Sequence, residues 1–219
     1  EHGKLMAVDT MRYVPLGFDI EGEYLFHPYL MAWFHKFLAL FGWTDSVIYS
    51  SIIYPVFMFA LTVIALFLLS RSIFKKSLGQ NKSNIIGLLS AFFISVIPVF
   101  LPRTIAGIPE KESAAFLFMF LAFYFFLESW NAEGKSKRYV LAILAALSTA
   151  AMANIWGGYI FIFIIIAPTV FIAFLLQKVD HKKILIYASW LLASLIVLSF
   201  TSTRFAPINF IYSLYTAVP

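Results

Sequence analysis

The fold class is decided by one uncharged stretch, Val47-Ile-Tyr-Ser-Ser-Ile-Ile-Tyr-Pro-Val-Phe-Met-Phe-Ala-Leu-Thr-Val-Ile-Ala-Leu-Phe-Leu-Leu-Ser70. A helix needs about 20 mostly apolar residues to cross the hydrocarbon core of a bilayer, and this stretch is long enough. It lacks the sustained apolar-polar alternation of an outer-membrane barrel strand. The stretch therefore predicts a transmembrane helix, in which every backbone polar group finds a partner inside the segment.

Five more stretches of the same kind follow, over residues 85–101, 113–130, 139–155, 159–176 and 184–201. The composition agrees, because 62% of the residues are hydrophobic and 12% are charged, whereas soluble domains are about 45–50% apolar and about 25% charged. The sequence predicts an all-α membrane protein, with a multi-span helical bundle of about six transmembrane helices over residues 47–201. Small residues dominate Ala142 to Ala153, which favours a central place for that helix.

The basic residues alternate between the two sides of this predicted bundle. The connections after the first, third and fifth spans carry ten of them: Arg71, Lys75, Lys76, Lys82, Lys135, Lys137, Arg138, Lys178, Lys182 and Lys183. The opposite connections and the tail carry Arg103, Lys111 and Arg204. Because basic connections stay in the cytoplasm, we expect a multi-pass protein of the cell membrane. The net charge of +5 then reflects topology or contact with anionic lipid headgroups, and no nucleic-acid partner is expected.

With this orientation, residues 1–46 form an external loop that holds six of the eleven acidic residues. Residues 27–38 mix apolar and polar side chains, which favours an amphipathic helix at the outer interface, with Trp33 and Trp43 at headgroup depth. If this stretch were instead another span, the sidedness of every loop would invert. Residues 202–219 are expected to begin a following external loop.

The external connection from Arg103 to Ser113 contains the candidate metal ligands, Glu110 and Glu112. Carboxylate oxygens suit hard cations such as Mg²⁺ and Mn²⁺. In a regular helix, side chains two positions apart point about 200° apart, so both reach one ion only in a loop or a first turn. Ordinary helix-start chemistry explains the same residues, because Pro109 suits the first helical position and acidic side chains offset the helix dipole.

Two further external features have both a structural and a functional interpretation. Trp156-Gly157-Gly158-Tyr159 is a predicted tight turn in which the aromatic residues anchor at the interface. Its glycines give the turn its freedom and would also let the backbone approach a ligand. Arg103 and Arg204 lie at the outer ends of spans, where each could snorkel or donate to a phosphate or carboxylate.

Taken together, these segments resemble the catalytic subunits of oligosaccharyltransferases. The run Arg103-Thr-Ile-Ala-Gly-Ile-Pro-Glu110-Lys-Glu112 resembles the second acidic motif of that family. The turn Trp156-Gly-Gly-Tyr159 is similar to the family's turn two spans later, and the run from Glu1 to Gly17 resembles the first external loop of archaeal members. The resemblance covers essentially all of the chain. One departure is Glu110, which stands where the family usually has Asp.

The resemblance implies a C-type glycosyltransferase fold and the transfer of an oligosaccharide from a dolichol phosphate or diphosphate carrier to Asn in Asn-x-Ser/Thr. It places Glu110 and Glu112 on positions that bind Mn²⁺ or Mg²⁺, with Arg103 supporting the acidic pair. The candidate substrate-binding residues are Trp156, Gly157, Gly158 and Arg204.

The family's first acidic motif and its catalytic glutamate loop are not found in this sequence. We therefore expect an N-terminal membrane-domain fragment that is inactive alone. The alternatives are another lipid-phosphate-dependent glycosyltransferase, or a transporter or non-enzymatic membrane subunit. A transporter is disfavoured because every ionisable residue lies at a span end, whereas transporters place such residues near the midplane.

Overall fold

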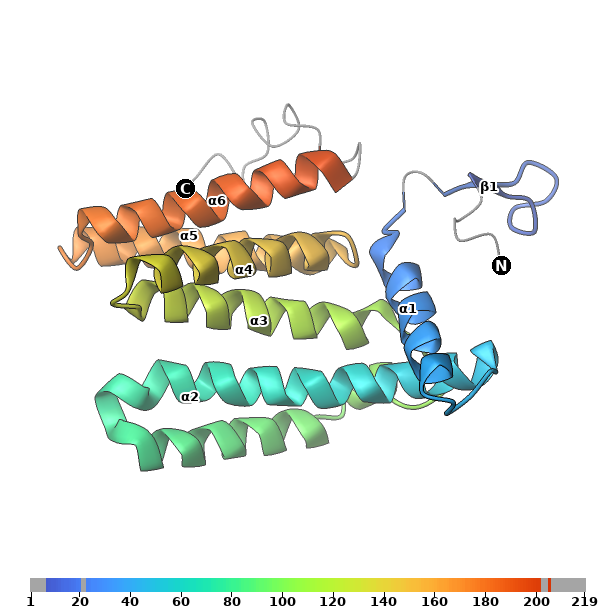
Figure 1. The fold of residues 1–219 in the computed structure, drawn as a ribbon, viewed down its shortest axis with the longest axis horizontal. Helices are drawn as coiled ribbons and strands as arrows, with labels where there is room; N and C mark the ends of the chain where they lie inside the picture. Colours follow the sequence, from blue (N-terminus) through green and yellow to red (C-terminus); the bar gives the residue numbers. More distant parts are fainter. Residues whose placement is uncertain (1–6, 21–22, 202–204, 206–219) are drawn as a thin grey trace.

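The computed structural model describes residues 7–20, 23–201 and 205 of this chain. Its long helices lie side by side in a bundle, and one shorter helix crosses one end of that bundle (Figure 1). Within the described residues the strands are β1 (Val8–Asp9) and β2 (Phe18–Asp19), which pair antiparallel with Val8 opposite Asp19. The predicted all-α class is confirmed.

The first two predicted spans are the two legs of α2 (Val47–Val96). Ser46 caps the first leg, because its side chain accepts a hydrogen bond from the Tyr49 N–H at 3.2 Å. Gly79, with φ 78° and ψ 173°, interrupts the helix in a conformation that only glycine adopts readily. The legs turn back on each other there (Figure 1). A Cβ at Gly87 would stand 2.8 Å from the Phe67 ring, so glycine permits the close approach of the legs.

The remaining elements are the 3₁₀ turns η1 (Leu101–Arg103) and η2 (Gly157–Tyr159) and the helices α3 (Lys111–Asn131), α4 (Lys135–Ala153), α5 (Ile160–Leu175) and α6 (His181–Thr201). By length and composition, four helical segments of the described chain could cross a membrane, namely α2, α3, residues 157–175 and α6. Basic residues occupy the first turn of α4, and weakly hydrophobic alanine fills much of the rest. The number of about six spans therefore stays a prediction.

The alanine-rich helix α4 packs between α3 and α6 (Figure 1). Its buried residues are mostly small, and they are Ala142, Ala145, Ala146, Ser148, Thr149, Ala150, Met152 and Ala153. Small side chains let helix backbones approach closely. The buried Trp190 of α6 fixes the contact, because its indole N–H donates to the Thr149 hydroxyl at 3.1 Å. The central position predicted for residues 142–153 is confirmed.

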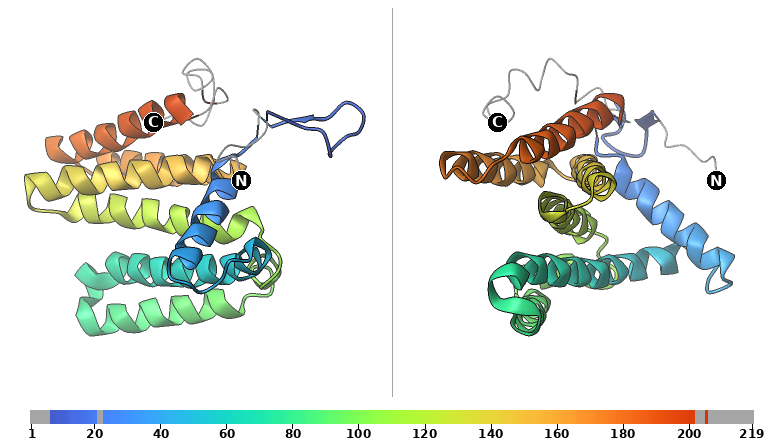
Figure 2. Two further views of the ribbon diagram at one scale, coloured as in Figure 1. Left: turned by 45° about the vertical axis from the view of Figure 1, so that its right-hand side comes forward. Right: turned by 60° about the vertical axis from the view of Figure 1, so that its left-hand side comes forward.

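Helix α1 (Phe26–Leu40) lies across one end of the bundle (Figures 1 and 2). Its 15 residues rise about 22 Å at about 1.5 Å per residue, which is less than the roughly 30 Å of a hydrocarbon core. This length favours the predicted surface helix, and the choice between a surface helix and a further span stays a prediction. Trp33 and Trp43 are exposed. The depth of α1 in a membrane stays a prediction.

The two ends of the bundle differ in charge. The basic end consists of the turn at Gly79 and the connections 132–134 and 176–180, around which the ten basic residues of the predicted cytoplasmic side gather. The opposite end, the site end, holds α1, residues 97–110 and η2 (Figure 2). The predicted separation of the two sets of connections is thus observed, while the side that faces the cytoplasm stays a prediction.

Candidate functional site

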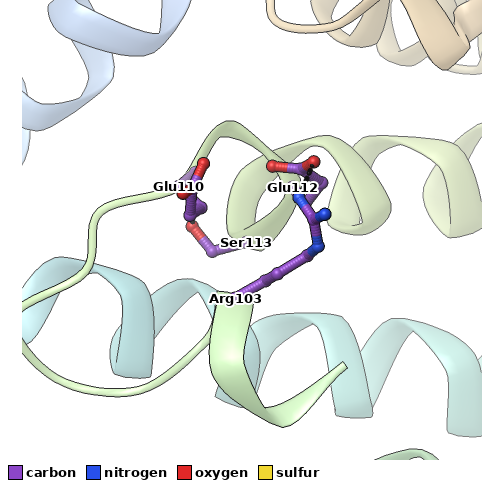
Figure 3. Close-up of polar contacts among 4 residues, drawn as sticks. All are labelled: Arg103, Glu110, Glu112 and Ser113. Carbon is purple, nitrogen blue, oxygen red and sulfur yellow. Dashed lines mark hydrogen bonds and ion pairs between the residues drawn. The ribbon is translucent and has the colours of Figure 1, made fainter. Parts of the chain in front are cut away.

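Glu110 and Glu112 lie at the start of α3, one outside the helix and one inside it. Glu110 is the N-cap residue with φ −69° and ψ 147°, and Glu112 is in the first turn (Figure 3). Because Glu110 has an extended backbone, the pair lies at a helix start and not within a regular helix. The condition set by the sequence for two carboxylates to share one ion is therefore met. The Lys111 ammonium reaches Glu23 at 3.5 Å and lies 5.2 Å from the Tyr24 ring.

Arg103 extends from η1 and forms an ion pair with the Glu112 carboxylate (Figure 3). The Glu112 side chain is 13% exposed and the Arg103 side chain is 50% exposed. A hydrogen bond between two charged groups is stronger than one between neutral groups. The structure therefore brings Arg103, Glu110 and Glu112 together, with one of the two carboxylates already neutralised.

The connection from Arg103 to Ser113, the acidic loop, is tied to α2 by its backbone. The N–H of Gly107, which has a φ of 89°, donates to the Ile52 carbonyl at 3.0 Å. Pro55 lies inside α2, and a proline disturbs the hydrogen bonds of the preceding turn. Deeper down, the buried Thr62 hydroxyl shares its single proton between the Met58 carbonyl at 2.8 Å and the Ser113 carbonyl at 3.3 Å. These contacts hold the start of α3 against the first leg of α2.

His27 of α1 is a further residue at this site, and it was not among the candidates that the sequence indicated. Its imidazole is 5% exposed, and Nε2 lies 3.1 Å from the Pro109 carbonyl oxygen. A carbonyl only accepts, so Nε2 carries the proton and Nδ1 accepts from the Tyr54 hydroxyl at 3.4 Å. Burial lowers the pKa of His27, although the hydrogen bond to Pro109 opposes that shift. The His27–Pro109 contact joins residues 82 apart in the chain, so no local pattern could indicate it.

The same bond accounts for a difference from the expected helix start. Pro109 was expected at the first helical position, but α3 begins at Lys111. The carbonyl of Pro109 is taken by His27, and the Glu110 carbonyl accepts from the Ser113 hydroxyl at 2.8 Å. The expectation was wrong because a contact with α1 holds Pro109 in the loop.

The Trp156-Gly157-Gly158 turn lies beside the acidic loop. The Trp156 and Phe116 rings are 5.8 Å apart, and Phe116 belongs to α3. A Cβ at Gly158 would stand 1.9 Å from the Trp156 ring, and one at Gly157 would stand 3.0 Å from the Tyr24 hydroxyl. The glycines therefore admit two aromatic side chains. The fourth candidate for substrate binding, Arg204, lies outside the described residues.

The start of α1 contacts both parts of the site. The Phe26 N–H donates to the Asn154 carbonyl at 3.1 Å, just before the Trp-Gly-Gly turn. The next residue, His27, binds the acidic loop through Pro109. Two neighbouring residues of α1 thus set the position of the turn relative to the loop.

The donor set fits part of a metal site. Over residues 7–20, 23–201 and 205, no three His, Cys, Asp or Glu residues gather closely enough to hold an ion. Glu110 and Glu112 supply carboxylate oxygens, which suit Mn²⁺ or Mg²⁺. Such ions take about six ligands, so other groups would complete the coordination.

In a comparison with protein families, one family model matches almost the whole chain. The family model described as oligosaccharyl transferase STT3, N-terminal, matches residues 3–217. The dolichyl-diphosphooligosaccharide–protein glycosyltransferase subunit STT3 of Saccharomyces cerevisiae is 33% identical over 104 residues, which are 48% of this chain and 14% of the yeast protein. Subunit STT3B of Arabidopsis thaliana is 29% identical over 160 residues, which are 70% of this chain and 20% of the plant protein. The chain thus spans a minor part of the length of these relatives.

A solved structure has the same fold. The crystal structure of the Archaeoglobus fulgidus oligosaccharyltransferase in complex with Zn and sulfate superposes with a TM-score of 0.71 at 21% identity. The match covers 88% of this chain and 24% of the archaeal one. At this identity the likeness establishes the arrangement of the helices.

Proposed function

Since the chain belongs to the oligosaccharyl transferase STT3 family, we propose that the intact protein transfers an oligosaccharide from a dolichol phosphate or diphosphate carrier to the Asn side chain of Asn-x-Ser/Thr. The names of the yeast and plant relatives support a dolichyl diphosphate donor and a protein acceptor. The protein is a multi-pass membrane protein, and we assign the site end to the external face because the basic residues gather at the other end.

The observation that carries the proposal is the position of Glu110 as the N-cap of α3, two residues before Glu112. This geometry offers two carboxylates to one ion at the water-facing end of a helix. A bound Mn²⁺ or Mg²⁺ would polarise the glycosidic phosphate and stabilise the leaving group. The archaeal crystal structure is a complex with Zn and sulfate, which supports a bound metal in a protein of this fold.

Arg103 positions Glu112 and limits the negative charge of the pair. Without the guanidinium, two carboxylates two residues apart would repel each other and any phosphate that approached them. With it, Glu112 is held on the side of η1 (Figure 3). Trp156, Gly157 and Gly158 would form a wall beside the donor, and Arg204 would donate to its phosphate.

Replacing Glu110 or Glu112 by Gln in the intact protein tests the assignment. Each substitution keeps the size of the side chain and removes the charge, and we expect transfer of labelled glycan to an Asn-x-Thr peptide to fall by about 100-fold or more. Asp45→Asn, which changes an exposed carboxylate outside the acidic loop, is the control and keeps full activity. If both site variants also kept full activity, the metal role would be refuted.

A further inference from the structure

A cavity of about 310 Å³ opens at the basic end of the bundle, far from the acidic loop. It lies between the connection that joins α3 to α4 and the start of α6. The polar residues and the one ring that line it are Trp130, Glu133, Arg138, Asp180, Lys182 and Lys183. Three cations therefore face two carboxylates, and seven more basic residues surround the same end.

The basic side chains are held in place while donors remain available. The Lys183 ammonium donates to the Lys178 carbonyl at 2.6 Å and lies 5.4 Å from the centre of the Trp130 ring. One Arg138 nitrogen donates to the Ala132 carbonyl at 3.1 Å and to the Glu133 carbonyl at 3.3 Å. A guanidinium has five N–H groups and an ammonium has three, so both cations retain N–H groups for an anion.

Trp130 also lines an apolar groove. Its volume is about 340 Å³, and it runs between α2, α3 and α5 with Trp130 as one of its lining residues. The walls include Leu69, Phe126, Ile166, Val170 and Ala173. Its one hydroxyl, that of Thr169, donates to the Ile165 carbonyl at 2.6 Å. The groove therefore offers almost no polar group to an occupant.

Trp130 thus lines both a cationic cavity and an apolar groove, as a ligand with an anionic head and a long chain would require. Tryptophan prefers headgroup depth, and basic pockets between transmembrane helices bind anionic lipid heads. We propose that this end binds one anionic glycerophospholipid, with its phosphate beside Arg138, Lys182 and Lys183 and one acyl chain in the groove. The site shares no residue with the glycan-transfer site, so it does not depend on the proposed function.

The intact protein, freed of lipid in detergent, is titrated with fluorescent phosphatidylglycerol and with the phosphatidylcholine analogue. We expect phosphatidylglycerol to bind more tightly. Replacing Arg138, Lys182 and Lys183 together by Gln should weaken its binding by about 100-fold, as the loss of three cations at a membrane surface predicts. The single variant Lys182→Gln changes an exposed side chain, leaves the fold intact, and should weaken binding by about fivefold.

Lys75 and Lys82 provide the control, because they lie exposed at the same end but do not line the cavity. Changing both to Gln should weaken binding by less than the single variant Lys182→Gln does, because neither ammonium lines the cavity and surface charges are screened by salt. An equal loss in the control would reduce the effect to general surface charge and overturn the proposal.

The groove is tested separately with Ala173→Trp, which fills it without changing the charge. This variant should weaken the binding of phosphatidylglycerol and leave the binding of inorganic phosphate unchanged. The proposal fails if inorganic phosphate displaces the lipid at equal concentration, because the site would then recognise only the anionic group. It also fails if the intact wild-type protein binds no phospholipid here, because another part of the protein would then cover the groove.

Discussion

Replacing His27 by Phe should uncouple the acidic loop from α1. The imidazole makes two hydrogen bonds, to the Pro109 carbonyl at 3.1 Å and from the Tyr54 hydroxyl at 3.4 Å. Phenylalanine fills a similar volume and makes neither. Tyr54 is completely buried, so its hydroxyl would lose its partner inside the protein.

The expected cost has two parts. A buried hydroxyl left without a partner costs about 1–3 kcal/mol of stability, and losing the bond to Pro109 adds about 1 kcal/mol. Substituting a residue that orients metal ligands typically lowers metal affinity or activity by about 10–100-fold. We therefore expect a lower unfolding temperature and, separately, a 10–100-fold loss of Mn²⁺ affinity and glycan transfer.

The assay compares His27→Phe, His27→Gln and His35→Phe in the intact protein. Glutamine can place an amide N–H near the Nε2 position, so it should restore part of the activity. His35 lies on the same helix and bonds the Ser50 hydroxyl at 2.9 Å instead of the Pro109 carbonyl, so its variant should lose stability only. If His27→Phe lowered the unfolding temperature but kept wild-type Mn²⁺ affinity, His27 would have only a packing role and the argument would be refuted.

Three other outcomes are expected. Because burial holds the pKa of His27 below its usual 6.5, the folded state favours the neutral ring, so stability is complete above that pH and falls as the unfolded chain takes up a proton. The unfolding temperature should therefore drop between pH 7 and pH 5.5, and the drop should be smaller in His27→Gln. Gly158→Ala should displace the Trp156 ring and reduce glycan transfer. The control Gly134→Ala, whose added Cβ would have its nearest contact 3.9 Å away, should keep full transfer. Equal activities of the two variants would exclude a role for the ring. The 219-residue chain alone should transfer no glycan to an Asn-x-Thr peptide, because its described residues hold only part of a metal site, and measurable transfer would contradict this.

The sequence predicted the features that depend on local pattern. Apolar length indicated the helical segments, and small side chains indicated the central place of residues 142–153. The spacing of Glu110 and Glu112 showed that a shared ion requires a helix start, and the structure has that start at Lys111. Each of these properties is carried by residues close together in the chain.

The features that the sequence missed join residues far apart. Nothing near His27 indicates that its partner is Pro109, and that contact also moved the helix start away from Pro109. The cavity at Trp130 depends likewise on the meeting of α3, α4 and α6. Burial and hydrogen-bond partners of this kind arise only when the helices pack.

The turn at Gly79 has a consequence for how the protein enters its membrane. The two legs of α2 are joined without an intervening loop, so neither leg can be oriented independently of the other. Lys75, Lys76 and Lys82 flank this turn, and positive charge resists translocation. One cluster of charge therefore fixes the direction of both legs as they insert, and moving it would reverse the pair as a unit.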